Sequence, residues 1–307
     1  MTTIFNNSTS AFYERSNQSL SSLRKEAEKL QSQLSSGARL TRSSDDPIAA
    51  SKLRTLARAE SLSKIDDTNA IRASSDLQLT DTALGSFADY ISRVREIAIA
   101  AGTGTLTDTQ RLGYGAELEQ LHGNLVSLAN TRDSAGHSLF GGATAGNAYT
   151  LDGAGNAVYA GTSSAGDLEL GDGQSVARGL TGPEFLNFSV GGTPTDLLAV
   201  VKDLGNALSG LSGDPAATAL GAREALNTAL DTVTTSQTIV GSRLAWIDMT
   251  SDRRVNLGEL RANEQKEVGA ADEAETIIRM QQVLTALEAS QASFAKLSAL
   301  SLFNAVS

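Results

Sequence analysis

The sequence contains no cysteine and only two histidines, His122 and His137. The absence of cysteine excludes disulfide bonds, thiolate metal sites and a cysteine nucleophile. We interpret His122 as a surface or partly packed helix residue and His137 as a turn residue that contacts the backbone. The zinc-protease HExxH motif, the phosphate-binding GxxxxGKS/T loop and the GxSxG nucleophile elbow are also missing. We therefore predict no catalytic, cofactor-binding or metal-binding residues and no enzymatic activity.

Long apolar runs are missing as well. No stretch approaches the roughly 18 consecutive apolar residues of a membrane-spanning helix, and residues 1–10 lack the basic and then apolar pattern of a secretory signal. The formal net charge of −10 argues against a nucleic acid partner. We expect a soluble chain without a membrane partner, either cytoplasmic or exported by a dedicated apparatus.

The two ends of the chain carry apolar residues at alternating spacings of three and four, which is typical of coiled-coil helices. Neither stripe is broad enough for a free-standing domain, so we expect the ends to pack on each other or on neighbouring copies. The stripes are Leu20, Leu23, Ala27, Leu30 and Leu34 near the N-terminus, and Ile277, Met280, Leu284, Leu287, Gln291 and Phe294 near the C-terminus. We predict an assembly interface at Leu20, Leu23, Leu30, Leu34, Ile277, Leu284, Leu287 and Phe294.

Helix start and stop signals divide the first half of the chain. A helix over residues 11–36 should end at Gly37, where glycine can adopt a left-handed conformation. Asp46 and Pro47 form an N-cap and first-turn pair, which opens a helix through residue 101. Thr107 and Gln110 form a capping box, and the helix that follows should run antiparallel to its predecessor and end near residue 136.

The composition changes sharply after this point. Residues 136–196 hold 14 of the 28 glycines and a single basic residue, Arg178, which predicts short strands and turns. Helices return over residues 196–211, 215–268 and 270–307. The nearly palindromic order predicts a mainly α fold: a long antiparallel helical rod or coiled coil formed by both chain ends, with a small Gly-rich β domain inserted at the tip. We expect this insert to be removable without loss of the helical body.

One turn in the insert has the composition of calcium-binding repeats. It spans Asp152, Gly153, Ala154, Gly155 and Asn156. A single imperfect copy is weak evidence, because Asp, Gly and Asn are also the ordinary residues of turns. Turn formation is the interpretation that we favour.

Two short motifs resemble those of the bacterial flagellin superfamily. Residues 34–39, Leu-Ser-Ser-Gly-Ala-Arg, and residues 45–47, Asp-Asp-Pro, match its LSSG-R and DDP signatures. Within the superfamily, the chain resembles the branch that forms the hook–filament junction more than the filament subunits. Pro47, the segment Ser138–Gly142 and the ending Leu297–Phe303 carry this distinction. The motif residues are Leu34, Ser35, Ser36, Gly37, Arg39, Asp45, Asp46 and Pro47.

The resemblance implies a secreted, extracellular structural subunit that passes through the flagellar type III apparatus. Its implied partners are further copies of itself in a ring or helical layer, hook-associated protein 1, flagellin and a flagellar export chaperone. It also implies an inner coiled-coil domain of residues 1–42 with 268–307, a helical rod of 43–140 with 195–267, and an outer domain of 141–194. Two alternatives remain open: a flagellin that forms the filament itself, and a surface adhesive module whose insert binds a carbohydrate or host surface.

Overall fold

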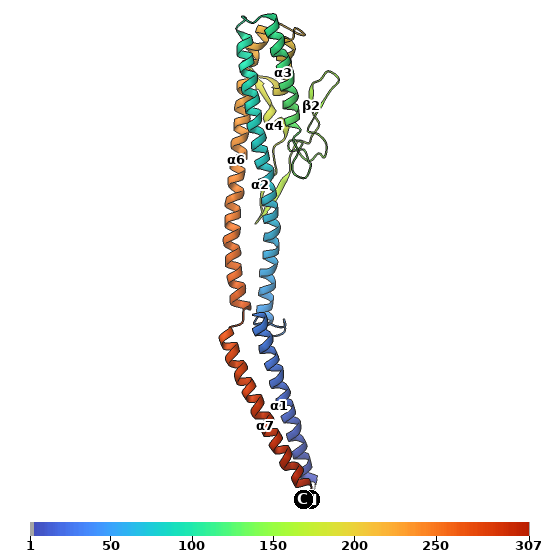
Figure 1. The fold of residues 1–307 in the computed structure, drawn as a ribbon, viewed down its shortest axis with the longest axis vertical. Coiled ribbons are helices and arrows are strands. Elements are labelled where there is room, and N and C mark those ends of the chain that lie inside the picture. The colour runs from blue at the N-terminus through green and yellow to red at the C-terminus, as the bar shows by residue number, and fades with distance from the viewer. Residues whose placement is uncertain (1–2, 307) are drawn as a thin grey trace. The chain divides into compact units, whose positions relative to one another are not determined.

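The computed structural model describes the backbone of residues 3–306 and the side chains of residues 11–297. This described part is mainly helical and contains six short strands (Figure 1). The helices are α1 Thr3–Ser36, α2 Pro47–Gly102, α3 Asp108–Ala129, α4 Gly182–Leu186, α5 Leu197–Leu208, α6 Pro215–Gly269 and α7 Glu273–Val306. The strands are β1 Tyr149–Leu151, β2 Ala157–Tyr159, β3 Asp167–Gly171, β4 Gln174–Ala177, β5 Asn187–Val190 and β6 Thr193–Asp196.

The chain divides into two compact units. Unit 1 consists of Met1–Ser61 and Asn256–Ser307, and unit 2 is Leu62–Val255. Unit 1 contains α1 and α7, which lie side by side with the two chain termini at the same end of the pair (Figure 1). Unit 2 contains α3, α5 and all the strands.

Local capping determines where the long helices begin. The Asp46 carboxylate accepts the Ala49 backbone N–H at 3.0 Å, and α2 starts at Pro47. Thr107 and Gln110 form the predicted capping box of α3, and Asp214 precedes α6, which starts at Pro215. These predicted starts are confirmed. α1 begins earlier than expected, at Thr3, and α3 ends at Ala129 rather than near residue 136.

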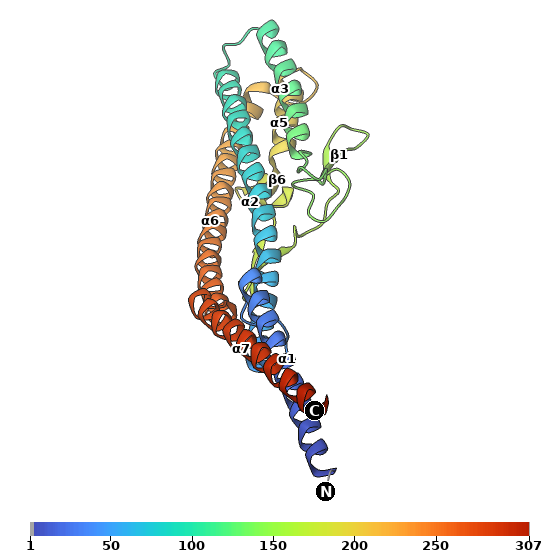
Figure 2. The same ribbon diagram turned by 60° about the horizontal axis from the view of Figure 1, so that its bottom comes forward.

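The core of unit 2 lies between its helices. α2 contributes a fully buried column that includes Leu84, Phe87 and Ile91. α3 and α5 run antiparallel and side by side (Figure 2). They approach so closely that a Cβ atom at Gly115 would lie 2.4 Å from the Ser209 Oγ. A larger residue at position 115 would require the Ser209 hydroxyl to move and the backbone at the end of α5 to shift slightly.

The strands form three separate two-stranded antiparallel sheets, β1 with β2, β3 with β4 and β5 with β6. All three lie in unit 2, where the β1–β2 hairpin stands to the side of the helices (Figures 1 and 2). The β3–β4 hairpin is held to two helices: Asn69 of α2 donates to the Glu169 carbonyl at 3.1 Å, and Arg254 of α6 donates to the Leu170 carbonyl at 2.8 Å. The predicted mainly α fold with a small strand-containing insert is confirmed.

Three aromatic rings join the insert to the helical core. Phe140 and Phe185 belong to the Gly-rich segment, and both pack on Phe87 of α2, with ring centroids 6.1 and 5.1 Å from that of Phe87. All three side chains are at most 1% exposed. This packing argues against the expectation that the insert can be removed without loss of the helical body, because deletion would take the Phe185 ring out of the centre of the core. The Gly-rich composition of the segment did not indicate that these few large apolar residues are part of the core.

We predict that Phe185→Ala lowers the free energy of unfolding by about 3–5 kcal/mol, because it removes a buried ring and leaves a cavity. Urea unfolding monitored by circular dichroism measures the loss. The control is Phe188→Ala, since Phe188 is only partly buried at the edge of the same core. Equal losses for the two variants would contradict the central place of Phe185.

Candidate assembly site

A single seam of side chains holds α1 against α7 in unit 1. On α1 it includes Leu20, Leu23, Leu30 and Leu34, all partly or fully buried. On α7 its most buried members are Thr276 and Val283, which are 7% and 9% exposed. At the far end, the Tyr13 and Phe294 rings meet edge to face with centroids 5.5 Å apart. The seam thus brings together most of the residues that the two sequence stripes identified.

The α7 column of the seam differs from the predicted one. Met280, Leu287 and Phe294 lie in it as expected, but Ile277 and Leu284 are each 42% exposed and lie outside it. Residues 276 and 283 take their places. Both columns have spacings of three and four, so spacing alone does not choose between them. Sequence periodicity therefore does not report which of the two columns faces α1.

This connection is a joint at which both chain segments leave the helical conformation. α1 ends at Gly37, whose φ of 67° lies in the left-handed region, as the sequence predicts. Ala38 and Ala270 then form an isolated antiparallel bridge. The Arg39 N–H donates to the Gly269 carbonyl at 2.8 Å, and the Ala271 N–H donates to the Gly37 carbonyl at 2.9 Å. The backbone groups released by the ending helices thereby satisfy one another.

The Arg39 side chain connects two helix ends at the joint. Its Nε and Nη2 atoms donate to the Val268 carbonyl at 3.3 and 3.1 Å, and Nη2 also lies 3.1 Å from the Asp46 carboxylate. Val268 is in the last turn of α6, where a cation is favourable, and Asp46 caps α2. The Ala49 N–H and then the Arg39 guanidinium hold the pKa of the Asp46 carboxyl below its usual value. One guanidinium therefore ties the end of α6 to the start of α2.

Asp45 orders the loop between Gly37 and α2. Its carboxylate accepts from the Thr41 hydroxyl at 3.0 Å and from the Arg42 N–H at 3.2 Å, and the Lys29 ammonium lies 3.6 Å away. The Thr41 hydrogen bond is the main reason that the pKa of Asp45 is lowered. The two motifs that the sequence offered as family markers thus meet in one structure: the first ends α1 and pairs with the α6–α7 connection, and the second starts α2. Side chains 298–303 of the C-terminal motif lie outside the described residues.

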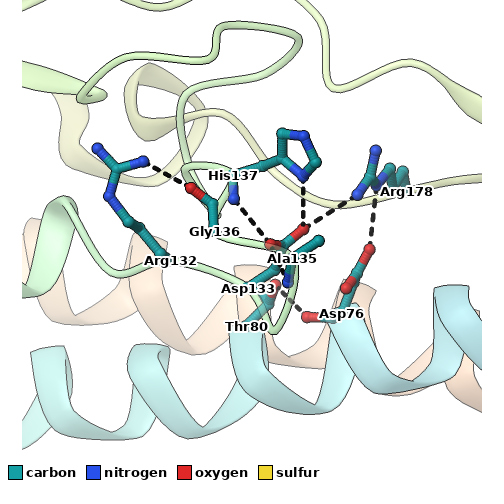
Figure 3. A network of polar contacts seen from close by, with 8 residues as sticks. All are labelled: Asp76, Thr80, Arg132, Asp133, Ala135, Gly136, His137 and Arg178. Carbon is teal, nitrogen blue, oxygen red and sulfur yellow. Dashed lines mark hydrogen bonds and ion pairs between the residues drawn. The ribbon is translucent and has the colours of Figure 1, made fainter.

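A buried polar network fastens the insert in unit 2 (Figure 3). Arg178 donates to Asp76 of α2 at 3.0 Å and to Asp133, in the turn after α3, at 3.1 Å. These carboxylate side chains are only 7% and 5% exposed. The Asp133 carboxylate also accepts the backbone N–H groups of Ala135 and His137. Sequence reasoning missed this network, although the only basic residue of a Gly-rich insert was a usable signal.

The environment of Asp133 favours its ionised form. Burial alone would raise the pKa of this carboxyl, but the N–H groups of His137 and Ala135 oppose burial, as do the charges of His137 and Arg178. The net result is a pKa below the usual value.

For His122, burial and the nearby Lys202 ammonium lower the pKa of the imidazole. His122 is half-buried on α3 and His137 lies in the turn, which are the positions expected from the sequence.

The turn with calcium-like composition already contacts a cation of the chain itself. The Lys202 ammonium of α5 donates to the Ala154 carbonyl at 2.5 Å and to the Asn156 side chain at 2.7 Å. The Asp152 carboxylate accepts from the Ala154 and Asn156 N–H groups, each at 2.8 Å. Turn formation thus accounts for these residues.

Within the described residues, no three or more His, Asp or Glu side chains are grouped as metal ligands. None of the helices, as far as they are described, has the length and hydropathy needed to cross a bilayer.

Comparison with known proteins shows what the first half of the chain is similar to. Residues 7–145 match the family model described as the bacterial flagellin N-terminal helical region. Flagellar hook-associated protein 3 of Salmonella typhimurium is 32% identical over 135 residues, which are 44% of this chain and 43% of that protein. The Escherichia coli protein of the same name is 30% identical over the same length. This chain is therefore aligned with less than half of the length of these relatives.

Solved structures share the fold over a larger part of the chain. A flagellar hook-associated protein from Vibrio parahaemolyticus superimposes with a TM-score of 0.67 and 24% identity, covering 74% of this chain and all of that one. Flagellar hook-associated protein 3 from Legionella pneumophila gives a TM-score of 0.63 and 17% identity, covering 70% of this chain and 98% of its own. At these identities the likeness establishes the fold alone. The predicted resemblance to the flagellin superfamily, and to hook-associated protein 3 within it, is confirmed.

We predict that Arg39→Gln loosens the joint, because glutamine cannot hold the Val268 carbonyl and the Asp46 carboxylate together. Amide hydrogen exchange should become about threefold faster at residues 39 and 271, a modest change that suits an exposed ion pair. Arg42→Gln is the matched control, since Arg42 takes part in the loop through its backbone N–H and carbonyl groups. Unchanged exchange in Arg39→Gln would show that the backbone bridge alone maintains the joint.

We predict that Asp133 makes the stability of unit 2 dependent on pH. Because the pKa of Asp133 is lowered in the folded chain, its contribution is present above the unfolded value of about 3.9 and is lost as the pH falls through the lowered value. Asp133→Asn should therefore be less stable than the parent at pH 7, by about 2 kcal/mol, and the difference should shrink on acidification.

Urea unfolding at a series of pH values from neutral to acidic measures this difference. Asp89→Asn, at an exposed position of α2, should follow the parent at every pH. A constant difference between Asp133→Asn and the parent down to the acid limit would contradict the assignment.

Proposed function

We propose that this chain, whose residues 7–145 match the family model of the bacterial flagellin N-terminal helical region, is a structural subunit of the bacterial flagellum that joins the hook to the filament. The supporting observation is the α1–α7 pair, which has one buried seam and a joint built from the motif residues. A helix pair of this kind gains a fuller core when further helices pack on it. The curated relatives named flagellar hook-associated protein 3 support the junction role over other flagellar positions.

The partners follow from this role. The chain would form a layer with copies of itself, contact hook-associated protein 1 on one side and flagellin on the other, and be escorted by an export chaperone. It would leave the cell through the flagellar type III apparatus and function outside it. In this proposal, residues 1–42 with 268–307 form the polymerising inner domain, 43–140 with 195–267 the rod, and 141–194 the outer part. Ile277 and Leu284 remain in the proposed assembly interface, because their exposed side chains are available to a neighbouring copy.

The role is mechanical and involves no catalysis. The polar clusters of the described residues are explained by structural contacts: Arg178 joins Asp76 and Asp133, and Lys202 closes the Asp152–Asn156 turn. The alternative function is that of a flagellin, the filament subunit itself. It is favoured by one observation, the match of residues 7–145 to a region named after flagellin.

Deletion of the gene from its host separates the two functions. We predict cells that retain hooks, lack attached filaments and release flagellin into the medium, as seen by electron microscopy and by analysis of the culture fluid. Complementation with the parent chain should restore filaments. Complementation with Leu287→Asp plus Phe294→Asp should not, because two charges would enter the apolar seam.

The control carries Thr285→Asp and Ala292→Asp, two exposed positions of α7 outside the seam. It adds the same charge to the same helix and should retain the α1–α7 pair, as judged by circular dichroism of the purified chain. Cells without the gene that contain no flagellin in the medium, yet have normal hooks, would favour the filament subunit instead. Normal filaments in the deletion strain would contradict both functions.

A further inference from the structure

A small polar cavity of unit 2 lies beside the Arg178 network that Figure 3 shows. Its volume is about 230 Å³. It is lined by the turn after α3 and the segment that follows up to Thr144, by Arg178 and Gly179, and by Asp76 of α2. A water molecule occupies about 30 Å³ in the liquid. The cavity therefore has room for an ion together with part of its hydration shell.

The wall of this cavity carries a buried hydroxyl group that the chain itself does not satisfy. Ser138 is only 5% exposed, and its Oγ atom has no hydrogen-bond partner among the described residues. Burial of a polar group without a partner is unfavourable, so such a group calls for a ligand or an ordered water. Because Ser138 lines the cavity, a partner for its hydroxyl can come from there.

The charges that line the cavity do not cancel. Asp76 and Asp133 share the single guanidinium of Arg178, at 3.0 and 3.1 Å, and their side chains are 7% and 5% exposed. The His137 imidazole lies 3.5 Å from the Asp133 carboxylate and adds a positive charge only when it is protonated. At neutral imidazole, one negative charge is therefore left over in a largely buried place, which is unfavourable without a further cation.

The neighbouring cations of the chain are engaged elsewhere. Arg132 donates to the Gly136 carbonyl at 2.6 Å and Arg243 donates to the Gly179 carbonyl at 2.8 Å, and neither side chain lines the cavity. The charge that remains between the two carboxylates is thus open to a cation from solution.

One carboxylate oxygen remains available to such a cation. Asp133 uses both of its oxygens, since Oδ1 accepts the N–H groups of Ala135 and His137 and Oδ2 accepts from Arg178. Asp76 Oδ2 accepts from Arg178, whereas Asp76 Oδ1 accepts no hydrogen bond from the described residues. The cavity thus offers one anionic oxygen and the neutral hydroxyl of Ser138.

The wall opposite the α2 helix is held in place by the chain's own hydrogen bonds. The Ala143 N–H donates to the Thr162 hydroxyl at 2.8 Å, and the Thr162 N–H donates to the Gly141 carbonyl at 3.0 Å. Gly142 has a φ of 67°, and a Cβ atom there would lie 2.2 Å from the Thr162 Oγ1. A ligand that enters the cavity therefore meets a wall that is already formed, which lowers the cost of binding.

From these observations we infer that the cavity binds a monovalent metal ion of the sodium or potassium class, which contacts Asp76 Oδ1 and the Ser138 hydroxyl oxygen. The ion neutralises the charge left over between the two carboxylates and holds the turn after α3 against α2. Calcium and magnesium do not fit as well, because their sites combine several charged or carbonyl oxygens and only one carboxylate oxygen is available here. This site goes beyond the proposed function and does not depend on it.

Urea unfolding of the purified full-length chain, followed by circular dichroism at pH 8.5, tests the inference. Imidazoles are neutral at this pH. The salts are KCl, NaCl and choline chloride, each at 0.2 M, so that the ionic strength is constant and the bulky choline ion serves as the reference. In the better of KCl and NaCl, the ratio of folded to unfolded parent chain should be about tenfold higher than in choline chloride, as for a dissociation constant of about 20 mM.

Two variants locate the ion. Ser138→Ala should be at least as stable as the parent in choline chloride, because it removes the unsatisfied hydroxyl, and should lose most of the tenfold gain. Asp76→Asn removes the surplus charge and should lose the gain as well. It also weakens the contact with Arg178, so its readout is the ratio between the salts and not its stability. Ser134→Ala and Asp89→Asn, at exposed positions, are the matched controls and should keep the gain.

Three results would overturn the inference. The first is a parent chain that is equally stable in all three salts, or a gain that persists undiminished in both Ser138→Ala and Asp76→Asn. The second is a loss of stability in Ser138→Ala that is the same in choline chloride and in KCl, because the hydroxyl would then have another partner, such as water. The third is a gain in CaCl₂ or MgCl₂ of equal ionic strength without any gain in KCl or NaCl.

Discussion

Two helices in contact can bury only one column of side chains on each, and this geometric limit governs the whole chain. In unit 1 the limit is visible directly: Leu30 and Val283, its most buried large side chains, are still 7% and 9% exposed. Unit 2 escapes it because α2, α3, α5 and α6 surround a common centre, where Phe87, Leu118 and Leu226 are fully buried. The same types of residue therefore give a complete body in one unit and an incomplete one in the other, and that difference makes unit 1 the part suited to association.

The joint illustrates how a break in a helical chain can be specified. Ending a helix releases backbone carbonyl and N–H groups that must find partners, and here both breaks occur where Ala38 and Ala270 can pair. Gly37 supplies the left-handed residue, Asp46 caps the next helix, and Arg39 connects the neighbouring helix ends. Each motif residue thus has a local reason for its identity. A continuous helix through this region would need none of them.

Local signals predicted the helical skeleton well, because capping and left-handed glycine depend on only a few adjacent residues. Pro47, the Thr107–Gln110 box and Gly37 were located correctly for this reason. Long-range choices were less accessible. Periodicity alone did not determine which α7 face meets α1, where Thr276 and Val283 are buried and Ile277 and Leu284 are exposed. The role of the insert depends on a few residues, Phe140, Phe185 and Arg178, whose partners lie far away in the chain. The overall composition of the insert does not indicate the contacts of such single residues.

The contact between Arg39 and Val268 spans 229 positions in the chain, which has a consequence for the order of folding. The backbone bridge of the joint and the Arg39–Val268 contact link an early segment to a late one, so they cannot form until the later segment has been made. Unit 2, by contrast, is one continuous stretch from Leu62 to Val255 and can collapse as soon as that stretch is available. Because closing so long a loop is slow and entropically unfavourable, the topology delays the pairing of the two ends until the rest of the molecule has formed. We therefore expect the pairing of α1 with α7 to follow the folding of unit 2.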